Sequence, residues 1–434
     1  MDNKTSVMKF LKKHNMYYYD INIMNACNTF IEEMENGLNN KKSTLKMIPT
    51  YISVDNDIDY NNSVVAIDAG GTNFRVAFVS FDHEKKPVIE YLKKYPMPGT
   101  NGEITKEEFL KQIVEYISPI IDKSDKIGFC FSYPTEILPN KDGRLIKFNK
   151  EVKIKGMDGE KLGEGLINAL EKNGYSSNKK IVLVNDTVAT LLGGKAKTNN
   201  RTFDSYIGFI LGTGTNTCYI EENKKIKKNK YLYNQCGSSI INIESGGYAR
   251  MPRSDIDDAF DAITYEPGTQ LFEKMVSGGY QGGLMMEVIK QAIKDNLFSQ
   301  NFSERINRIS ELSSGEINDF CYFPYGDNIL AKIITNEEDR LTLYYIIDAF
   351  FERVARLVAI NLAAVMLKIN KGKNPCKPIC ISIEGTTFNK SKMLREKLNF
   401  YVKSFIKEEL GIYCEFVNFE NITIIGAAIA GLLG

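Results

Sequence analysis

Residues 64–81 decide the fold and read Val64-Val65-Ala66-Ile67-Asp68-Ala69-Gly70-Gly71-Thr72-Asn73-Phe74-Arg75-Val76-Ala77-Phe78-Val79-Ser80-Phe81. Two runs rich in β-branched and aromatic residues flank a Gly-Gly-Thr-Asn connection, a pattern that predicts a β-hairpin. The first strand then ends in the carboxylate of Asp68, beside a loop with an open backbone. Glycines let N–H groups approach an anion, and such a carboxylate could hold hydrated Mg²⁺. The stretch predicts a phosphate-binding loop, although Gly-Gly alone is also consistent with a plain turn.

The same pattern recurs at residues 207–220, which read Ile207-Gly208-Phe209-Ile210-Leu211-Gly212-Thr213-Gly214-Thr215-Asn216-Thr217-Cys218-Tyr219-Ile220. The two Gly-Thr-Asn triplets begin at Gly71 and Gly214, 143 positions apart (214 − 71). This distance is about the length of one domain and suggests a duplicated unit. Two facing hairpins could then hold a polyphosphate from both sides.

Composition favours a globular protein of two domains with a cleft between them. The chain has 434 residues, of which 43% are hydrophobic and 25% charged, and single cores rarely grow to that size. The net charge is +1, from 55 basic and 54 acidic residues, so neither nucleic acid nor a membrane surface is an expected partner. The basic cluster at residues 224–230 is expected to be a solvated loop.

Eight cysteines are scattered along the chain without a paired framework. This usage fits a reducing compartment and predicts a cytoplasmic protein. The start of the chain, Met-Asp-Asn-Lys, offers no apolar signal core. The longest apolar block, Leu357–Leu367, is interrupted by Asn361 and is too short to cross a bilayer.

Periodicity predicts the main elements. Residues 1–60 are expected to be mainly helical, with helices over Met8–Met24 and Thr29–Leu38. Leu45–Ile52 is expected to be extended, and Pro49 excludes it from a central position in a sheet. Further expected elements are a helix over Ile104–Ile121 capped by Thr105, a strand over Lys126–Pro134, a helix over Glu164–Asn173, a strand over Ile181–Val184, and a helix over Leu341–Leu367.

Several polar residues stand where predicted strands or helices begin or end. Asp186 follows the strand Ile181–Val184, and it could either cap the next helix or take a proton from a substrate hydroxyl. The flanking phosphate loops favour the second role. Ser132, Asn185, Glu244 and Glu273 form what we call the hydroxyl-binding set, because their side chains suit the adjacent hydroxyls of a sugar.

A third strand followed by Gly-Thr occurs at Ile379–Glu384, which leads into Gly385 and Thr386. A small loop at this position could pack on an adenine and its ribose. The last apolar stretch, Ile422–Gly431, contains Gly426 and is expected to be a helix that approaches a neighbour closely.

With these motifs in order, the chain resembles the hexokinase family, in the version found in eukaryotes and some bacteria, from about Leu45 to its end. The resemblance rests on the following segments: Met47-Ile48-Pro49-Thr50-Tyr51, Ile67-Asp68-Ala69-Gly70-Gly71-Thr72-Asn73-Phe74-Arg75-Val76, Phe131-Ser132-Tyr133-Pro134, Asn185-Asp186-Thr187-Val188-Ala189-Thr190, Gly212-Thr213-Gly214-Thr215-Asn216, Asn242-Ile243-Glu244, and Pro267-Gly268-x-Gln270-x-Phe272-Glu273-Lys274-Met275.

This resemblance implies an α/β protein with the two-domain, actin-like (RNase H-like) sugar kinase fold. Residues 61–184 with 425–434 would form the small domain, and residues 1–60 with 185–424 the large one. The implied reaction is ATP-dependent phosphorylation of a hexose, with glucose expected, at its 6-hydroxyl, the first step of glycolysis. The implied partners are the hexose, ATP and Mg²⁺, and the implied protein is a monomer or homodimer.

The resemblance also implies roles for individual residues. Asp186 would be the general base, and Asp68 would face the magnesium ion through water. The implied sugar contacts are Ser132, Asn149, Lys150, Asn185, Asn216, Glu244, Gln270 and Glu273. The implied nucleotide contacts are Asp68, Gly70, Gly71, Thr72, Asn73, Arg75, Gly212, Thr213, Gly214, Gly385 and Thr386. The sequence departs from the family at Asn149-Lys150-Glu151, where the family has Thr-Lys-Gly, and at Phe388-Asn389-Lys390.

Two other classes of protein stay open at this point. A sensor of sugar or nucleotide would bind without turnover, yet Asp68, Asp186 and both phosphate loops are present. An actin-like filament protein or chaperone ATPase would share the phosphate hairpins, but it would not need the hydroxyl-binding set, because it does not bind a sugar.

Overall fold

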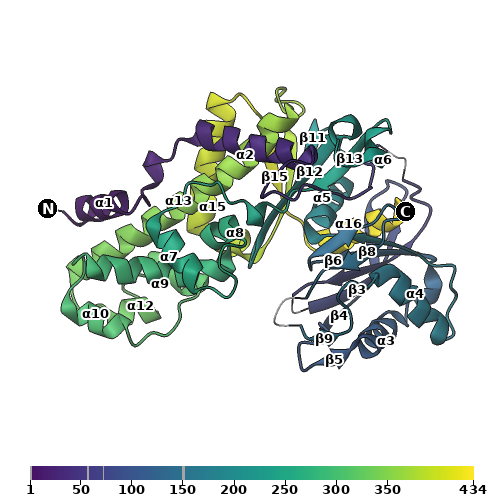
Figure 1. Ribbon diagram of the computed structural model, residues 1–434, viewed down its shortest axis with the longest axis horizontal. Coiled ribbons are helices and arrows are strands. Elements are labelled where there is room, and N and C mark those ends of the chain that lie inside the picture. Colours follow the sequence, from purple (N-terminus) through teal and green to yellow (C-terminus); the bar gives the residue numbers. More distant parts are fainter. Residues whose placement is uncertain (1, 56–57, 72, 149–151) are drawn as a thin grey trace.

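The computed structural model describes residues 2–55, 58–71, 73–148 and 152–434 (Figure 1). In these ranges the main strands form a six-stranded sheet, in the order β1-β13-β12-β11-β14-β15, and a five-stranded sheet, in the order β10-β6-β2-β3-β4. The strands of the six-stranded sheet are β1 Ile48–Pro49, β11 Ser205–Leu211, β12 Thr215–Glu222, β13 Ser238–Asn242, β14 Ile379–Glu384 and β15 Cys414–Val417. Those of the five-stranded sheet are β2 Val64–Ala69, β3 Asn73–Phe81, β4 Pro87–Pro96, β6 Lys126–Phe131 and β10 Lys180–Val184.

Helices cover both sheets. Those named below are α1 Asn3–Lys13, α2 Ile23–Leu38, α3 Lys106–Ile117, α4 Leu162–Lys172, α5 Asp186–Lys197, α7 Asp255–Ile263, α8 Leu271–Val276, α9 Gly278–Lys294, α13 Glu337–Ile369, α14 Thr386–Lys390 and α16 Ile422–Leu432.

The two sheets share one topology. In the smaller sheet β2, β3 and β4 are antiparallel, β6 pairs with β2 in parallel, and β10 pairs with β6 in parallel. In the larger sheet β11, β12 and β13 are antiparallel, β14 pairs with β11 in parallel, and β15 pairs with β14 in parallel. Both predicted hairpins, β2 with β3 and β11 with β12, are therefore confirmed, and they occupy equivalent places in the two sheets. This agrees with the duplicated unit that the repeated Gly-Thr-Asn triplets suggest.

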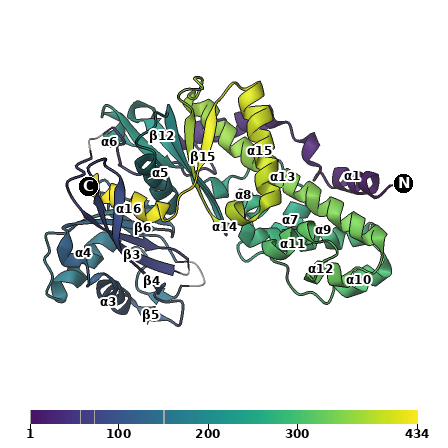
Figure 2. The same ribbon diagram turned by 180° about the vertical axis from the view of Figure 1, so that it is seen from behind.

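Helices α5 and α16 lie between the sheets (Figures 1 and 2). Each follows a strand of one sheet and packs on the other: α5 follows β10 and packs on β11 and β14, and α16 follows β15 and packs on β6 and β2. The helices cross at glycines, where a Cβ on Gly426 would lie 1.7 Å from the carbonyl oxygen of Ala189. A Cβ on Gly193 would lie 2.1 Å from the carbonyl oxygen of Ile422. Only glycine allows backbones to approach so closely.

Apolar side chains form separate cores on either side of this helical layer. One core is built from residues within 7–47 and 207–412, and it surrounds the long helix α13. A second lies entirely within residues 65–183. A third includes α5, α16 and the inner face of the smaller sheet. The molecule therefore has two lobes, each with its own core, joined by the crossing helices.

One predicted helix is wrong. Met8–Met24 is not continuous, because α1 ends at Lys13 and α2 begins at Ile23. Asn15 adopts a left-handed conformation with φ 54°, and the N–H of Met16 donates to the carbonyl of Leu11 at 2.8 Å. This is the Schellman arrangement that ends helices, and it turns the side chain of Met16 into the core.

The other predicted elements are confirmed with shifted ends. Thr105 caps α3 in a capping box with Glu108, and Pro49 lies in β1 at the edge of its sheet. Residues 39–55 and 58–60, however, are not helical, although the prediction made residues 1–60 mainly helical. All eight cysteines lie in the described ranges and are free thiols. Over the same ranges, no helix combines the length and the apolar character needed to cross a membrane.

Candidate active site

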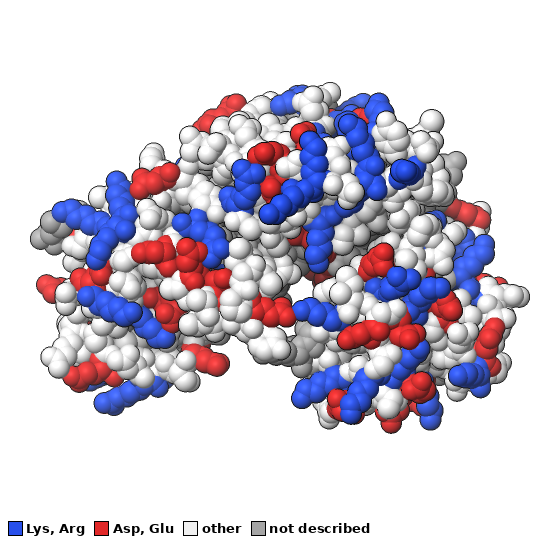
Figure 3. Space-filling view, viewed as in Figure 1, with Lys and Arg blue, Asp and Glu red and all other residues white. Residues whose placement is uncertain are grey.

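A cavity of about 710 Å³ lies between the lobes, where Figure 3 shows the hollow that separates them. Its walls are turns and strand ends from both sheets and the start of α8. The predicted site residues that line it are Gly71, Ser132, Asn185, Asp186, Thr213, Gly214, Asn216, Glu244, Gln270 and Glu273. The structure thus brings together the whole hydroxyl-binding set, the predicted general base and part of both phosphate loops.

One wall of the cavity is a chain of amides and carboxylates. The side-chain amide of Asn216 donates to Oδ1 of Asn242 at 2.8 Å, and the amide of Asn242 donates to Oε1 of Glu244 at 2.7 Å. Glu244 has a left-handed backbone with φ 59°, which is uncommon outside glycine and concentrates at functional sites. In this network Oε1 of Glu244 accepts a hydrogen bond from within the protein.

Glu273, on α8, faces the second phosphate loop. Its Oε2 accepts the backbone N–H of Thr215 at 2.8 Å, and a Cβ on Gly214 would lie 2.6 Å from that oxygen. Burial raises the pKa of Glu273 to about 7, against the opposing effect of the Thr215 N–H, and the charges of Glu244 and Asp186 raise it further. The carboxyl group therefore titrates near neutral pH.

Asp186 is the first residue of α5, and Asn185 before it is the N-cap. The oxygen Oδ1 of Asp186 accepts the N–H of Thr187 at 2.7 Å, and Oδ1 of Asn185 accepts the same N–H at 2.9 Å. Burial raises the pKa of Asp186 to about 6, and the nearby carboxylates of Asp68 and Glu244 add to this rise. An aspartate with this pKa can take a proton near neutral pH. Since Asn185 provides the cap, Asp186 is not needed as one.

Asp68 lies at the end of β2 and is buried, with 4% of its surface exposed. Its Oδ2 pairs with the guanidinium of Arg75 and accepts the hydroxyl of Thr423 at 2.9 Å. Burial opposes the charge of Arg75, but the carboxylate of Asp68 holds the pKa of Arg75 above its usual value. Arg75 thus contacts Asp68 directly, and its predicted contact with a nucleotide stays a prediction.

The donor set fits a hydrated magnesium ion more closely than an ion held wholly by protein. Over the described ranges, groups of three or more His, Cys, Asp or Glu side chains that could hold a metal are absent. Mg²⁺ is usually held by one or two carboxylates together with substrate phosphates and water. Asp68 could serve as that carboxylate.

The two predicted phosphate loops are fixed by neighbouring elements. The hydroxyl of Tyr133 donates to the carbonyls of Gly70 and Gly71 at 2.9 and 3.3 Å. The carbonyl of Gly212 accepts the N–H of Gly278, at the start of α9, and the hydroxyl of Thr387 in α14, at 2.8 and 2.7 Å. Both loops direct these carbonyls into the protein. The N–H groups of Gly70 and Gly212 donate to the carbonyls of Asn73 and Gly214 at 3.0 and 2.9 Å, so the donors left for an anion are those of Gly71, Thr213 and Gly214.

The remaining predicted residues lie outside the cavity lining. A Cβ on Gly212 would lie 3.3 Å from Cα of Gly385, so the predicted adenosine loop adjoins the second phosphate loop. Thr386 begins α14 there, and Asn73 begins β3 opposite Gly70. Thr72, Asn149 and Lys150 lie outside the described residues.

Sequence reasoning missed four residues of the site: Tyr133, Asn242, Glu384 and Thr423. Thr423 is the second residue of α16, close to the place that Asp186 has as the first residue of α5, so the internal repeat was the signal that could have found it. Glu384 ends β14 beside Gly385, and its Oε2 is buried without a hydrogen-bond partner. Burial raises the pKa of Glu384 to about 7, against the effect of Arg75, and Asp68 and Asp186 raise it further.

Comparisons with known proteins agree with this geometry. Two family models, both described as hexokinase, match residues 9–196 and 206–433. Hexokinase-1 of Schizosaccharomyces pombe is 28% identical over 425 residues, which cover 93% of this chain and 86% of that protein. Human hexokinase-1 is 27% identical over 410 residues, which cover 87% of this chain and 44% of that protein. The chain therefore spans less than half of the human relative.

Solved structures show the same architecture. A hexokinase from Schistosoma mansoni, complexed with glucose, matches with a TM-score of 0.79 and 24% identity, over 99% of this chain and 98% of that one. Another hexokinase crystal structure matches with a TM-score of 0.77 and 18% identity, over 99% of both chains. The two lobes, the repeated sheets and the crossing helices are the fold of these proteins.

Proposed function

This chain belongs to the hexokinase family, and from that premise we propose that Asp186 removes the proton from the 6-hydroxyl of glucose as this hydroxyl attacks the γ-phosphate of ATP. Family membership makes the protein an enzyme, an ATP-dependent hexose kinase whose reaction begins glycolysis. The main support for this role of Asp186 is its position. Its carboxyl group, with a pKa of about 6, lies in one cavity with the hydroxyl-binding set.

The sugar is held by residues from both lobes. Ser132 belongs to the smaller lobe, and Asn216, Glu244, Gln270 and Glu273 belong to the larger one. Carboxylates accept hydrogen bonds from adjacent hydroxyls, and amides can both donate and accept. Asn149 and Lys150 are further sugar contacts in this proposal, on the strength of the family resemblance alone.

The phosphates of ATP lie between the two glycine loops. The N–H groups of Gly71, Thr213 and Gly214 would stabilise charge on the transferred group, and residues 385–386 would pack on the adenosine. Bound Mg²⁺ would neutralise phosphate charge, and Asp68 would hold it through water, with its own carboxylate oriented by Arg75 and Thr423. The base and the sugar contacts position the 6-hydroxyl in line with the phosphate.

The domain division predicted from the sequence is proposed as it stands: residues 61–184 with 425–434, and residues 1–60 with 185–424. Its support is that one core lies within 65–183 and another within 7–47 and 207–412. We also propose a cytoplasmic monomer or homodimer. The free thiols fit that compartment.

A coupled assay of ADP release tests this function. Glucose, mannose, fructose and glucosamine are supplied in turn with ATP and Mg²⁺, and ADP release is expected to depend on the sugar and to be fastest with glucose. ATP hydrolysis at the same rate without sugar would overturn the proposal in favour of an ATPase. Sugar binding without ADP release would overturn it in favour of a sensor.

The rate should fall in acid in two steps. Below pH about 7 Glu273 gains a proton and loses an acceptor for the sugar, and below pH about 6 Asp186 is protonated and cannot act as a base. A plot of log(kcat/KM) for glucose against pH should therefore be flat above pH 7 and approach a slope of about 2 below pH 6. Glu273→Gln should keep only the Asp186 step, with a slope of about 1. A wild-type profile that stays flat down to pH 5 would refute both roles.

A further inference from the structure

An ion pair joins the two lobes. The ammonium of Lys147, in the smaller lobe, lies 2.7 Å from Oε1 of Glu266, which belongs to the loop between α7 and α8 in the larger lobe. Near the centre of Figure 3 an acidic and a basic side chain face each other across the boundary between the lobes. The two side chains are 55% and 46% exposed, so water and salt reach them.

The Lys147 end is anchored to the wall that carries Ser132. Phe148, next in the chain, packs its ring against Tyr133 at 4.9 Å and against Phe131 at 5.9 Å between ring centroids. Tyr133 lines the cavity and donates to the carbonyls of the first phosphate loop. A displacement of Lys147 is therefore transmitted to that wall through the packed rings of Phe148 and Tyr133.

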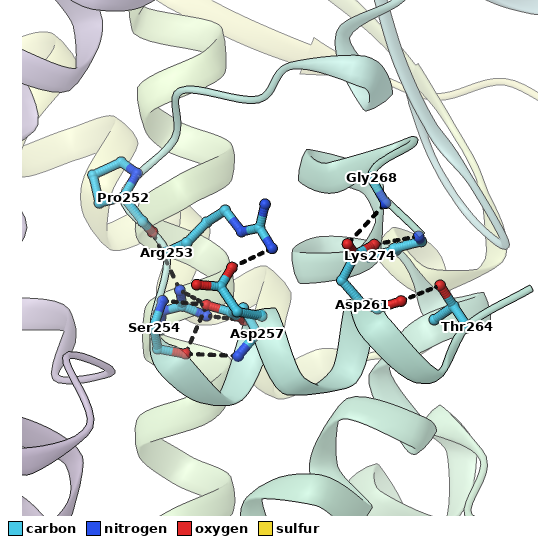
Figure 4. Close-up of polar contacts among 10 residues, drawn as sticks. Pro252, Arg253, Ser254, Asp257, Asp261, Thr264, Gly268 and Lys274 are labelled. Atoms are coloured by element: carbon cyan, nitrogen blue, oxygen red, sulfur yellow. Dashed lines mark hydrogen bonds and ion pairs between the residues drawn. The ribbon is translucent and has the colours of Figure 1, made fainter. Parts of the chain in front are cut away.

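The Glu266 end is anchored to the wall that carries Gln270 and Glu273. The ammonium of Lys274 donates to the main-chain carbonyl of Glu266 at 2.8 Å and pairs with Asp261 at 2.5 Å. Asp261 also accepts the N–H of Gly268 at 2.8 Å. Figure 4 shows Asp261 of α7 in contact with Gly268 of the loop and with Lys274 of α8. Lys274 adjoins Glu273 in the chain, so the loop and the sugar-binding carboxylate belong to one rigid unit.

We propose that Lys147 and Glu266 are positioning residues for sugar binding, a pair that holds the two walls of the cavity at the separation the hexose requires. This rests on the proposed function, because the hexose must contact both lobes at once. A protein whose binding-competent state is only partly populated loses apparent affinity in proportion. Breaking the pair lowers that population, which raises KM for the sugar and leaves the chemical step unchanged.

Steady-state kinetics with glucose test the pair directly. Lys147→Gln should raise KM for glucose about two- to fivefold, the range of an exposed ion pair, with kcat within about 1.5-fold of wild type. In a Glu266→Gln background Lys147→Gln should have no further effect, and the exchanged pair Lys147→Glu with Glu266→Lys should restore KM. Salt at 0.5 M should raise the wild-type KM toward that of Lys147→Gln, since exposed charges are screened.

The matched control is Glu103→Gln, because the Lys155–Glu103 pair has the same 2.7 Å separation and lies within the smaller lobe. It should leave KM unchanged. Small-angle scattering adds a readout that needs no turnover: Lys147→Gln without sugar should have a larger radius of gyration than wild type. Equal KM and equal radius of gyration in Lys147→Gln and wild type would overturn the proposed role of the pair. Absence of ADP release with every hexose would instead overturn the proposed function, and the scattering result would still stand.

Discussion

Replacing Asp186 by asparagine should lower kcat by about 10²- to 10⁴-fold, the usual contribution of a general base. The amide oxygen of asparagine can still accept the N–H of Thr187, as Oδ1 of Asp186 does at 2.7 Å. The cap of α5 remains, because it belongs to Asn185. The substitution thus removes the proton acceptor and leaves its surroundings intact.

The measurement is kcat from the coupled assay, together with glucose affinity by calorimetry and the thermal midpoint of unfolding. Affinity and midpoint should stay close to wild type. The matched control is Asp258→Asn, which also changes an aspartate in the first turn of a helix, α7, and which does not line the cavity. A kcat within tenfold of wild type in Asp186→Asn would remove this residue from the mechanism.

Replacing Asp257 by alanine should destabilise the protein by about 3–5 kcal/mol, because it leaves a buried charge without its partner. Arg353 is 1% exposed, and its guanidinium lies 2.5 Å from Oδ2 and 3.1 Å from Oδ1 of Asp257. The same carboxylate forms the capping box of α7 with Ser254. Figure 4 shows Ser254 and Asp257 at the start of that helix. The substitution therefore weakens the core around Arg353 and the start of α7, the helix that carries Asp261.

Urea unfolding followed by circular dichroism measures this effect as a shift of the midpoint. Asp258→Ala removes a partner of Arg253 that is 65% exposed, and it should change stability by no more than about 0.5 kcal/mol. Asp257→Asn combined with Arg353→Met should cost less than Asp257→Ala alone, since it removes both charges. A loss below about 1 kcal/mol in Asp257→Ala would contradict the argument from burial.

Local patterns predicted the elements of the fold but not all their ends. Apolar runs rich in β-branched and aromatic residues on either side of glycine-rich turns identified both hairpins. Thr105 with Glu108 identified the start of α3, since these signals act within a few residues. The helix predicted over Met8–Met24 failed, because Asn15 and Met16 end α1 by a left-handed turn. Apolar spacing continues through that turn, so periodicity alone could not detect it.

The site residues that could be predicted are those whose position next to a strand end or a glycine loop is visible in the sequence. Those that reach the site only through the packing of distant elements could not be predicted. Asp68 and Asp186 end strands beside glycine loops or a helix start, which is visible in the sequence. Thr423 reaches Asp68 only because α16 packs on the smaller sheet. Glu384 looks like an ordinary strand residue until folding buries its Oε2. Such contacts depend on tertiary structure, on which neighbouring residues carry no information.

The crossing of α5 and α16 determines how the lobes can move. At Gly426 and Gly193 backbone meets backbone with no side chain between them, and close-packed surfaces of this kind cannot be compressed. The helices cannot approach each other more closely there, so the crossing can act as a pivot about which the lobes rotate. Lys147 and Glu266 belong to different lobes, so a rotation that opens the cavity has to part the two side chains. Even a weak contact then opposes that rotation.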